Sequence, residues 1–138
     1  VGEELLEISD AMNLSIDPSY DISAAFDANI RTMQAERKII KLRGTSRKVL
    51  RTLPLRQFDF VYVDGSHTSG SALMDGILCL DLLKTGGLLI FDDYRWNCFP
   101  DAPLKNPGSG IDAFLSCFGD EIEIVHKDYQ VIVRKTEP

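Results

Sequence analysis

The stretches FDFVYVDGSH at residues 58–67 and LLIFDDY at residues 88–94 decide the fold of this 138-residue chain. Each opens with a continuous run of apolar, β-branched and aromatic side chains, which is typical of a buried β-strand. A helical pattern over residues 71–83 separates the two runs, and Gly86 and Gly87 predict a turn after it. Two continuous apolar strands joined by a helix predict a parallel sheet that is covered on both faces.

The remaining segments extend this alternation of helices and strands in both directions. Residues 1–12 fit one helical face, with a strand over residues 5–8 as the alternative, and residues 13–17 fit a strand that ends in an Asp-Pro turn. We further expect a helix that Ser23 caps over residues 23–34, a strand over 38–42, helices over 46–53 and 111–118, and a hairpin of residues 121–126 and 130–134. The sequence therefore predicts a single α/β domain over residues 1–138, with a Rossmann-like, mostly parallel sheet, helices on both faces and a C-terminal antiparallel hairpin.

The composition excludes several classes of protein. A formal net charge of −6 argues against a surface that coats nucleic acid, and the apolar runs are too short to span a membrane. Three cysteines without a Cys-x-x-Cys spacing fit neither a disulfide framework nor a zinc site, and we expect Cys79 to lie in the core. Because no signal peptide is visible, we expect a cytoplasmic protein. Its oligomeric state is left open, homo-oligomers included.

Polar groups follow both decisive strands at the point where each strand ends. Asp64, Gly65 and His67 follow the first strand, and Asp92 and Asp93 follow the second. In open parallel sheets, ligands bind beyond the carboxyl ends of the strands, although Asp-Gly-Ser also forms simple turns and helix caps. We expect Asp64, Asp92 and Asp93 to converge in one crevice, where oxygen ligands suit Mg²⁺, Ca²⁺ or Mn²⁺. His67 could take a proton there, and the adjacent acids should have raised pKa values unless a cation or hydrogen-bond donors lie beside them.

The combined pattern of residues 58–94 resembles class I S-adenosylmethionine-dependent methyltransferases. It is most similar to the group with an Asp-Gly-x-His turn after the fourth strand, a Leu-Lys-x-Gly-Gly step, and an Asp-Asp-Tyr after the fifth strand. Small-molecule and sugar O-methyltransferases are related to this group. The resemblance implies S-adenosylmethionine as the cofactor and a divalent metal, such as Mg²⁺, on Asp64, Asp92 and Asp93.

The resemblance also assigns roles to residues earlier in the chain. Asp17 matches the acid that holds the ribose hydroxyls of the cofactor. The Gly-Thr-Ser stretch at residues 44–46 matches the loop that borders the adenine, although it could instead only cap a helix. The expected cofactor-binding residues are Asp17, Gly44, Thr45, Ser46, Asp64 and Gly65, and the expected catalytic residues are Asp64 and His67.

One departure from the family pattern concerns the start of the domain. The glycine-rich loop that clasps the methionine part of the cofactor should lie about twenty residues before Asp17, and the chain has no Gly-x-Gly there. Residues 5–9 resemble the first strand, but too few residues separate them from Asp17 for the usual loop and helix. Three explanations compete: the chain is a fragment, or a loop and a helix are missing from it, or the domain has lost its cofactor site. We favour the first two explanations, because the acidic crevice is kept.

Three functions compete for this pattern. It favours an enzyme, a methyltransferase that transfers a methyl group to a hydroxyl of a small molecule. The alternative is a non-catalytic domain of the same fold that acts as a binding module. A phospho-acceptor receiver domain is disfavoured, because its paired acids follow the first strand and not the last long parallel one. The methyl acceptor is not readable, although Tyr94, Trp96 and Phe99 would line its pocket if they do not simply pack.

Overall fold

The computed structural model describes residues 21–136 of the chain. The chain forms two compact units, residues 1–43 and residues 44–138. The elements predicted before residue 18, and with them Asp17, lie outside the described residues. Among the helices that the structure describes, none is long and apolar enough to cross a bilayer.

The described part of the first unit holds one helix, α2 (Ile22–Thr32), close to the predicted range 23–34. The predicted cap, Ser23, lies inside the helix. Asp21 caps it instead, because its carboxylate accepts a hydrogen bond of 3.0 Å from the backbone amide of Ala24.

The strand predicted over residues 38–42 is wrong, because these residues form turns and irregular chain. A strand needs a second strand to pair its backbone groups, and the described part of the first unit contains none. The side chain of Lys41 turns back to the helix, with Nζ 2.7 Å from a carboxylate oxygen of Asp27. Local β-propensity therefore does not decide the structure of this segment.

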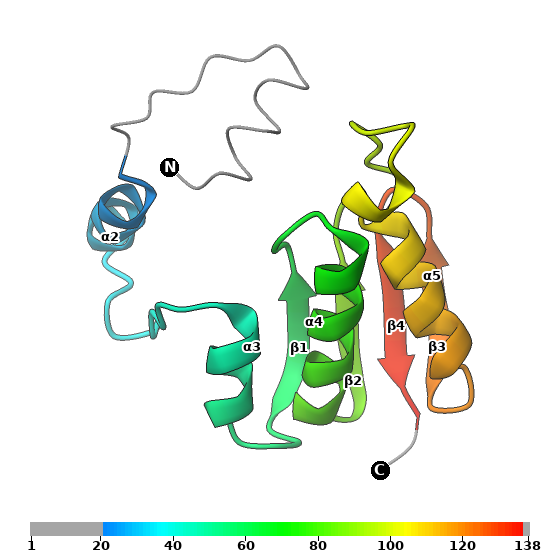
Figure 1. The fold of residues 1–138 in the computed structure, drawn as a ribbon. Coiled ribbons are helices and arrows are strands. Elements are labelled where there is room, and N and C mark those ends of the chain that lie inside the picture. Colours follow the sequence, from blue (N-terminus) through cyan, green and yellow to red (C-terminus); the bar gives the residue numbers. More distant parts are fainter. Residues whose placement is uncertain (1–20, 137–138) are drawn as a thin grey trace. The chain divides into compact units, whose positions relative to one another are not determined.

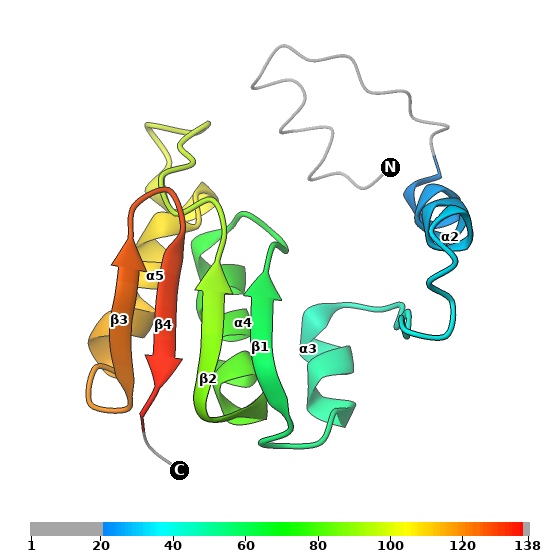
Figure 2. The ribbon, with the colours of Figure 1, turned by 180° about the vertical axis from the view of Figure 1, so that it is seen from behind.

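The second unit is built on a four-stranded sheet in the order β1-β2-β4-β3, which Figure 2 shows from its open side. β1 and β2 run parallel, whereas β4 is antiparallel to both β2 and β3. This confirms the α/β, Rossmann-like fold with a C-terminal antiparallel hairpin; in the described residues, one of the three strand pairings is parallel. The strands are β1 (Phe58–Val63), β2 (Leu83–Phe91), β3 (Ile122–Lys127) and β4 (Val131–Lys135).

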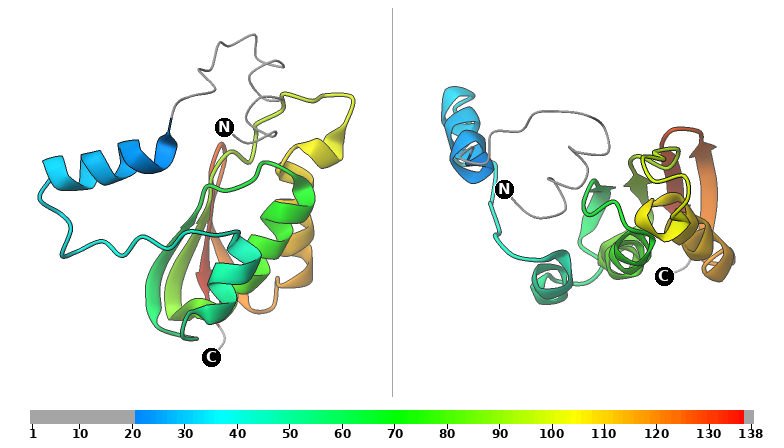
Figure 3. Two further views of the ribbon diagram at one scale, coloured as in Figure 1. Left: turned by 60° about the vertical axis from the view of Figure 1, so that its left-hand side comes forward. Right: turned by 45° about the horizontal axis from the view of Figure 1, so that its top comes forward.

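The helices of the second unit lie on one face of this sheet (Figures 1 and 3). They correspond to the predicted helices over residues 46–53, 71–83 and 111–118, with shifted ends. α4 begins before its predicted start because Thr68 caps it and accepts a hydrogen bond from the amide of Ser71. The helical segments are α3 (Ser46–Val49), which continues as η1 (Leu50–Thr52), α4 (Ser69–Leu82), η2 (Pro103–Lys105) and α5 (Gly108–Cys117).

The core lies between the helices and the sheet. Phe91 of β2 and Phe114 of α5 are at most 1% exposed, and their rings meet edge to face at 5.1 Å. Gly76 lets α4 pack onto these rings, since a Cβ at this position would lie 2.7 Å from Cζ of Phe91. Cys79 is 2% exposed, which confirms the prediction that it lies in the core.

Two details of the strands differ from the prediction. β1 is not buried on both faces, because 52% of Phe60 and 43% of Tyr62 are exposed on the face that the helices of this unit leave open. Gly86 and Gly87 lie inside β2 and not in a turn before it. The strand is irregular there, and Gly86 takes a φ of +82°, which suits a residue without a Cβ.

Candidate functional site

The parallel pairing of β1 and β2 brings their carboxyl ends together. Val63 and Phe91 are paired in the sheet, and the amide of Asp92 donates to the carbonyl of Val63 at 3.0 Å. The loops that follow the two strands therefore start side by side. They line a small hollow with the predicted residues Asp64, Gly65, His67, Asp92 and Asp93, to which Ser66 is added.

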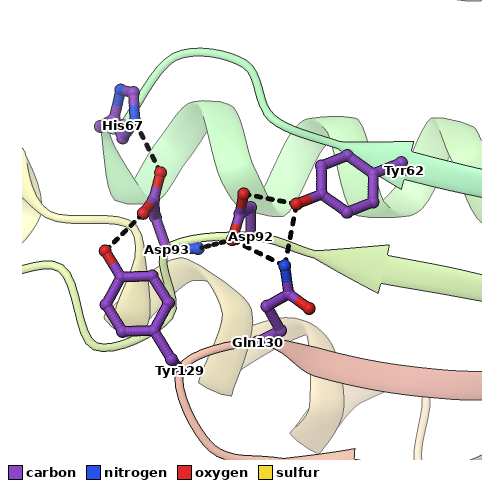
Figure 4. A network of polar contacts seen from close by, with 6 residues as sticks. All are labelled: Tyr62, His67, Asp92, Asp93, Tyr129 and Gln130. Atoms are coloured by element: carbon purple, nitrogen blue, oxygen red, sulfur yellow. Dashed lines mark hydrogen bonds and ion pairs between the residues drawn. The ribbon is translucent and has the colours of Figure 1, made fainter.

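Asp93 and His67 form the centre of this hollow. Nε2 of His67 lies 3.0 Å from Oδ2 of Asp93, and about a quarter of each side chain is exposed, 25% and 21% respectively. The hydroxyl of Tyr129 donates to the other carboxylate oxygen of Asp93 at 2.7 Å (Figure 4). On its other side, the imidazole ring lies 4.9 Å from the ring of Trp96. These contacts fix Asp93 and the imidazole relative to each other.

Asp92 has a separate set of partners. The hydroxyl of Tyr62 donates to its Oδ2, and the amide group of Gln130 donates to its Oδ1 at 3.1 Å (Figure 4). The backbone amide of Asp93 also donates to Oδ1, at 2.9 Å. The hydrogen bond from Tyr62 holds the pKa of Asp92 below its usual range and raises the pKa of Tyr62 to about 12. These hydrogen-bond donors thus offset the electrostatic repulsion that is expected between two adjacent carboxylates.

Adjacent acids can serve different partners here because of the backbone at Asp93. Its φ is +56°, a left-handed conformation that aspartate tolerates better than most residues. The chain turns sharply at this point, and the two side chains diverge in Figure 4, one towards Tyr62 and the other towards His67. The sequence shows only that the two acids are adjacent.

The tip of the β3–β4 hairpin supplies site residues that the sequence analysis missed. Tyr129 and Gln130 come from this tip, where the sequence predicts only a turn at Tyr129 and the start of a strand at Gln130. The tip is tied to the loop after β2, because the amide of Tyr94 donates to the carbonyl of Tyr129 at 2.8 Å and Arg95 pairs with Asp128 at 2.7 Å. The sequence does show two polar side chains near a hairpin tip, which could have marked them as site candidates. The sequence around them, however, does not indicate that this tip lies beside the end of β2.

The predicted metal set is brought together only in part. Ligand atoms of Asp64, His67 and Asp93 all lie within 4.8 Å of one another, whereas Asp92 is not part of this group. Carboxylate oxygens with one imidazole nitrogen are donors that Mn²⁺ and related divalent ions accept. The set Asp64, Asp92 and Asp93 stays a prediction.

A larger cavity, of about 370 Å³, lies at the start of α3. Gly44, Thr45 and Ser46 line it, and the side chain of Thr45 makes no capping hydrogen bond to the helix that follows. Gly44 has a φ of +154°, and a Cβ there would lie 2.8 Å from Cγ2 of Val49. The short loop is thus compact and offers hydroxyl groups to the cavity, of a size that small ligands occupy. The remaining lining residues are Arg47, Ser66, Ser71 and Asp75.

A third cavity, of about 300 Å³, lies beside the loop after β2. Tyr94 and Trp96, two of the three aromatic residues considered for an acceptor pocket, line it together with Asn97 and Asp112. Phe99 does not line it and packs against the ring of Trp96, with ring centres 5.9 Å apart. Trp96 thus lines this cavity and also contacts the imidazole of His67.

Residues 5–94 match the model of a family described as a methyltransferase domain. The matched range includes β1, α4, β2 and both groups of polar residues that follow the parallel strands. No curated protein matches the chain.

Proposed function

The chain belongs to a family of methyltransferase domains, and we propose that it transfers the methyl group of S-adenosylmethionine to a hydroxyl group of a small molecule. The observation that supports this most directly is the hydrogen-bonded pair of His67 and Asp93, which lies at the ends of two neighbouring parallel strands. One ligand-sized cavity shares Ser66 with the hollow that holds this pair, and a second is lined by Trp96, whose ring contacts that of His67.

The proposed cofactor site is the cavity at residues 44–46 together with the end of β1. Its fit to a nucleoside rests on compact backbone and small hydroxyl side chains at Thr45 and Ser46. Gly65 leaves room for the carboxylate of Asp75 in the wall of this cavity, since a Cβ there would lie 3.0 Å from a carboxylate oxygen of Asp75. We include Asp64 in this site; Asp17, which the resemblance assigns to the ribose hydroxyls, lies outside the described residues. The cofactor would supply a methyl group on a sulfonium, which needs no activation by the protein.

The protein's own chemistry is the removal of a proton from the acceptor. An alcohol must lose its proton as its oxygen forms the new bond, and an imidazole is the side chain best suited to accept it near neutral pH. Asp93 accepts a hydrogen bond from His67 and would stabilise the imidazolium that forms, and Tyr129 holds the carboxylate in place. The cavity beside Tyr94 and Trp96 is the proposed place of the acceptor.

A divalent cation offers a second way to activate the same hydroxyl. We propose Asp64 and Asp93 as its ligands, with His67 as the third, because their donor atoms lie within 4.8 Å of one another. Such a cation would lower the pKa of a bound hydroxyl group. If His67 bound the cation, its imidazole could not also act as the base. Activation by a cation and proton removal by His67 are therefore alternatives for one site.

Calorimetric titration of the full chain with S-adenosylhomocysteine tests the proposed cofactor site, and we expect this compound to bind. A transfer assay with a panel of hydroxylated small molecules tests the proposed reaction, and we expect it to release S-adenosylhomocysteine. His67→Gln should lower this rate by roughly 10²–10⁴-fold and leave cofactor affinity unchanged. The matched control is His126→Gln, on the exposed side of β3, which should change neither quantity.

The outcomes separate the competing functions. Binding of S-adenosylhomocysteine without transfer to any acceptor would favour the non-catalytic binding module, and no binding at all would refute the proposal. A titration with Mn²⁺ distinguishes the two chemistries: binding that His67→Gln and Asp93→Asn abolish supports the cation, and no binding supports the imidazole as base.

A further inference from the structure

Asp75 of α4 is a buried acid for which neither the sequence pattern nor the proposed chemistry provides a role. Only 6% of the residue is exposed, yet it lines the cavity of about 370 Å³ at the start of α3. The Ser46 hydroxyl donates to its carboxylate. On the other side, Oδ2 lies 3.0 Å from the place where a Cβ of Gly65 would be. The carboxyl group is thus held at the wall between the start of α3 and the end of β1.

Burial of a carboxyl group is costly unless it gains hydrogen-bond donors. Here burial is the largest influence on Asp75 and raises its pKa, whereas the hydrogen bond from Ser46 and the nearby Arg47 oppose this rise. A ligand that donates a hydrogen bond to this carboxyl group would stabilise it further. A ligand that presents an unprotonated oxygen would be repelled by the charged carboxylate.

The other lining groups are small and polar. Ser66, Thr68 and Ser71 form a row of hydroxyl groups: the Thr68 oxygen lies 3.5 Å from the Ser66 oxygen and 2.9 Å from the Ser71 oxygen. The two serines of this row line the cavity beside Asp75. A flat heteroaromatic ring with polar atoms on its edge could form hydrogen bonds with these hydroxyl groups. An amino group on the same edge could donate to the carboxylate of Asp75.

We propose that Asp75 selects the base of the cofactor, by accepting a hydrogen bond from the 6-amino group of adenine. This inference rests on the proposed function, since it assumes that the cavity holds the nucleoside of S-adenosylmethionine. Asp75 is then a specificity-determining residue that touches the cofactor and takes no part in methyl transfer. A site built to pair with one hydrogen-bonding group discriminates strongly against an analogue that lacks it.

The test compares S-adenosylhomocysteine with S-inosylhomocysteine, in which a carbonyl oxygen replaces the 6-amino group. Calorimetry on the full chain should show that the adenine compound binds at least about tenfold more tightly. In Asp75→Asn the side-chain amide can donate to the carbonyl oxygen, so this ratio should fall by roughly tenfold or invert. Asp81→Asn, an exposed acid on the same helix, is the matched control and should leave the ratio unchanged.

Each other outcome has a definite meaning. If Asp75→Asn weakens both compounds equally, Asp75 only supports the wall of the cavity, and the inference is wrong while the proposed function stands. If the unaltered protein binds neither compound, the proposed function fails and the inference fails with it. If Asp75→Asn does not fold, Ser46→Ala replaces it: loss of the hydroxyl that holds the carboxylate should lower the ratio, and an unchanged ratio would overturn the inference.

Discussion

Replacing Gly110 by alanine should destabilise the second unit by about 2 kcal/mol, because this glycine lies directly against the backbone of Ser69. A Cβ at position 110 would lie 1.9 Å from the carbonyl oxygen of Ser69 and 2.6 Å from its carbonyl carbon. Neither atom can rotate away, so the start of α5 must move from α4 by about 1 Å to reach an ordinary contact. Overpacking costs about 1–3 kcal/mol, and a clash with backbone belongs at the upper end. The better helix propensity of alanine returns about 1 kcal/mol.

Thermal unfolding of the full chain, followed by circular dichroism, measures this effect. A unit of this size loses roughly 4–8 °C of Tm for each kcal/mol, so we expect a fall of roughly 8–16 °C. Gly70→Ala, in the first turn of α4, is the matched control, because a Cβ there meets nothing within 4 Å. It should leave Tm unchanged or raise it slightly. Equal Tm values for the two variants would refute the packing argument.

Three further predictions concern buried or hydrogen-bonded groups. Lys135→Met should lower the free energy of unfolding in urea by roughly 1–3 kcal/mol. The buried ammonium group donates to two carbonyls at the end of α4, at 2.9 and 3.3 Å, and methionine leaves these carbonyls without that donor. An unchanged urea midpoint would contradict this. Hydrogen bonds to the acids after β2 raise the pKa of Tyr62 and Tyr129 to about 12. Since the folded state favours the neutral phenols, the stability that they contribute is complete below about pH 10 and is lost as the pH rises towards 12. An ultraviolet titration after fast pH jumps should show a late phenolate phase that Tyr62→Phe and Tyr129→Phe each reduce in amplitude. A late phase of unchanged amplitude in both variants would count against these bonds. Burial raises the pKa of the Cys79 thiol to about 12, so a thiol reagent should label the exposed Cys117 and reach Cys79 only after unfolding.

The sequence predicts the central part of the fold well because that part depends on short-range patterns. The apolar runs at residues 58–63 and 88–91, with a helix between them, imply two neighbouring parallel strands by the rules of chain connection. The same patterns predict the hairpin at the C-terminal end. They are less informative where pairing decides the outcome: residues 38–42 have the composition of a strand, but the described part of their unit offers no strand to pair with.

Burial is harder to predict than strand formation, and β1 shows why. An alternation of aromatic and β-branched residues indicates that the side chains fit a pleated surface. It does not indicate which face other elements cover. Val61 and Val63 pack on the core below the helices, whereas Phe60 and Tyr62 point to the face that the helices of this unit leave open. The hydroxyl of Tyr62 is thereby free to reach Asp92 at the end of the neighbouring strand.

The division of roles between Asp92 and Asp93 depends on parts of the chain that lie beyond the matched family range. That range ends at residue 94, whereas Gln130 and Tyr129, which donate to Asp92 and Asp93, come from the tip of the β3–β4 hairpin. Two adjacent acids in one sequence context have the same local pattern, so no periodicity or propensity can distinguish them. The antiparallel return of β4 beside β2 brings the donors within reach, and the left-handed backbone at Asp93 directs each acid to its own partner. The hairpin is therefore part of the site, because Gln130 and Tyr129 at its tip each donate a hydrogen bond to one of the two acids.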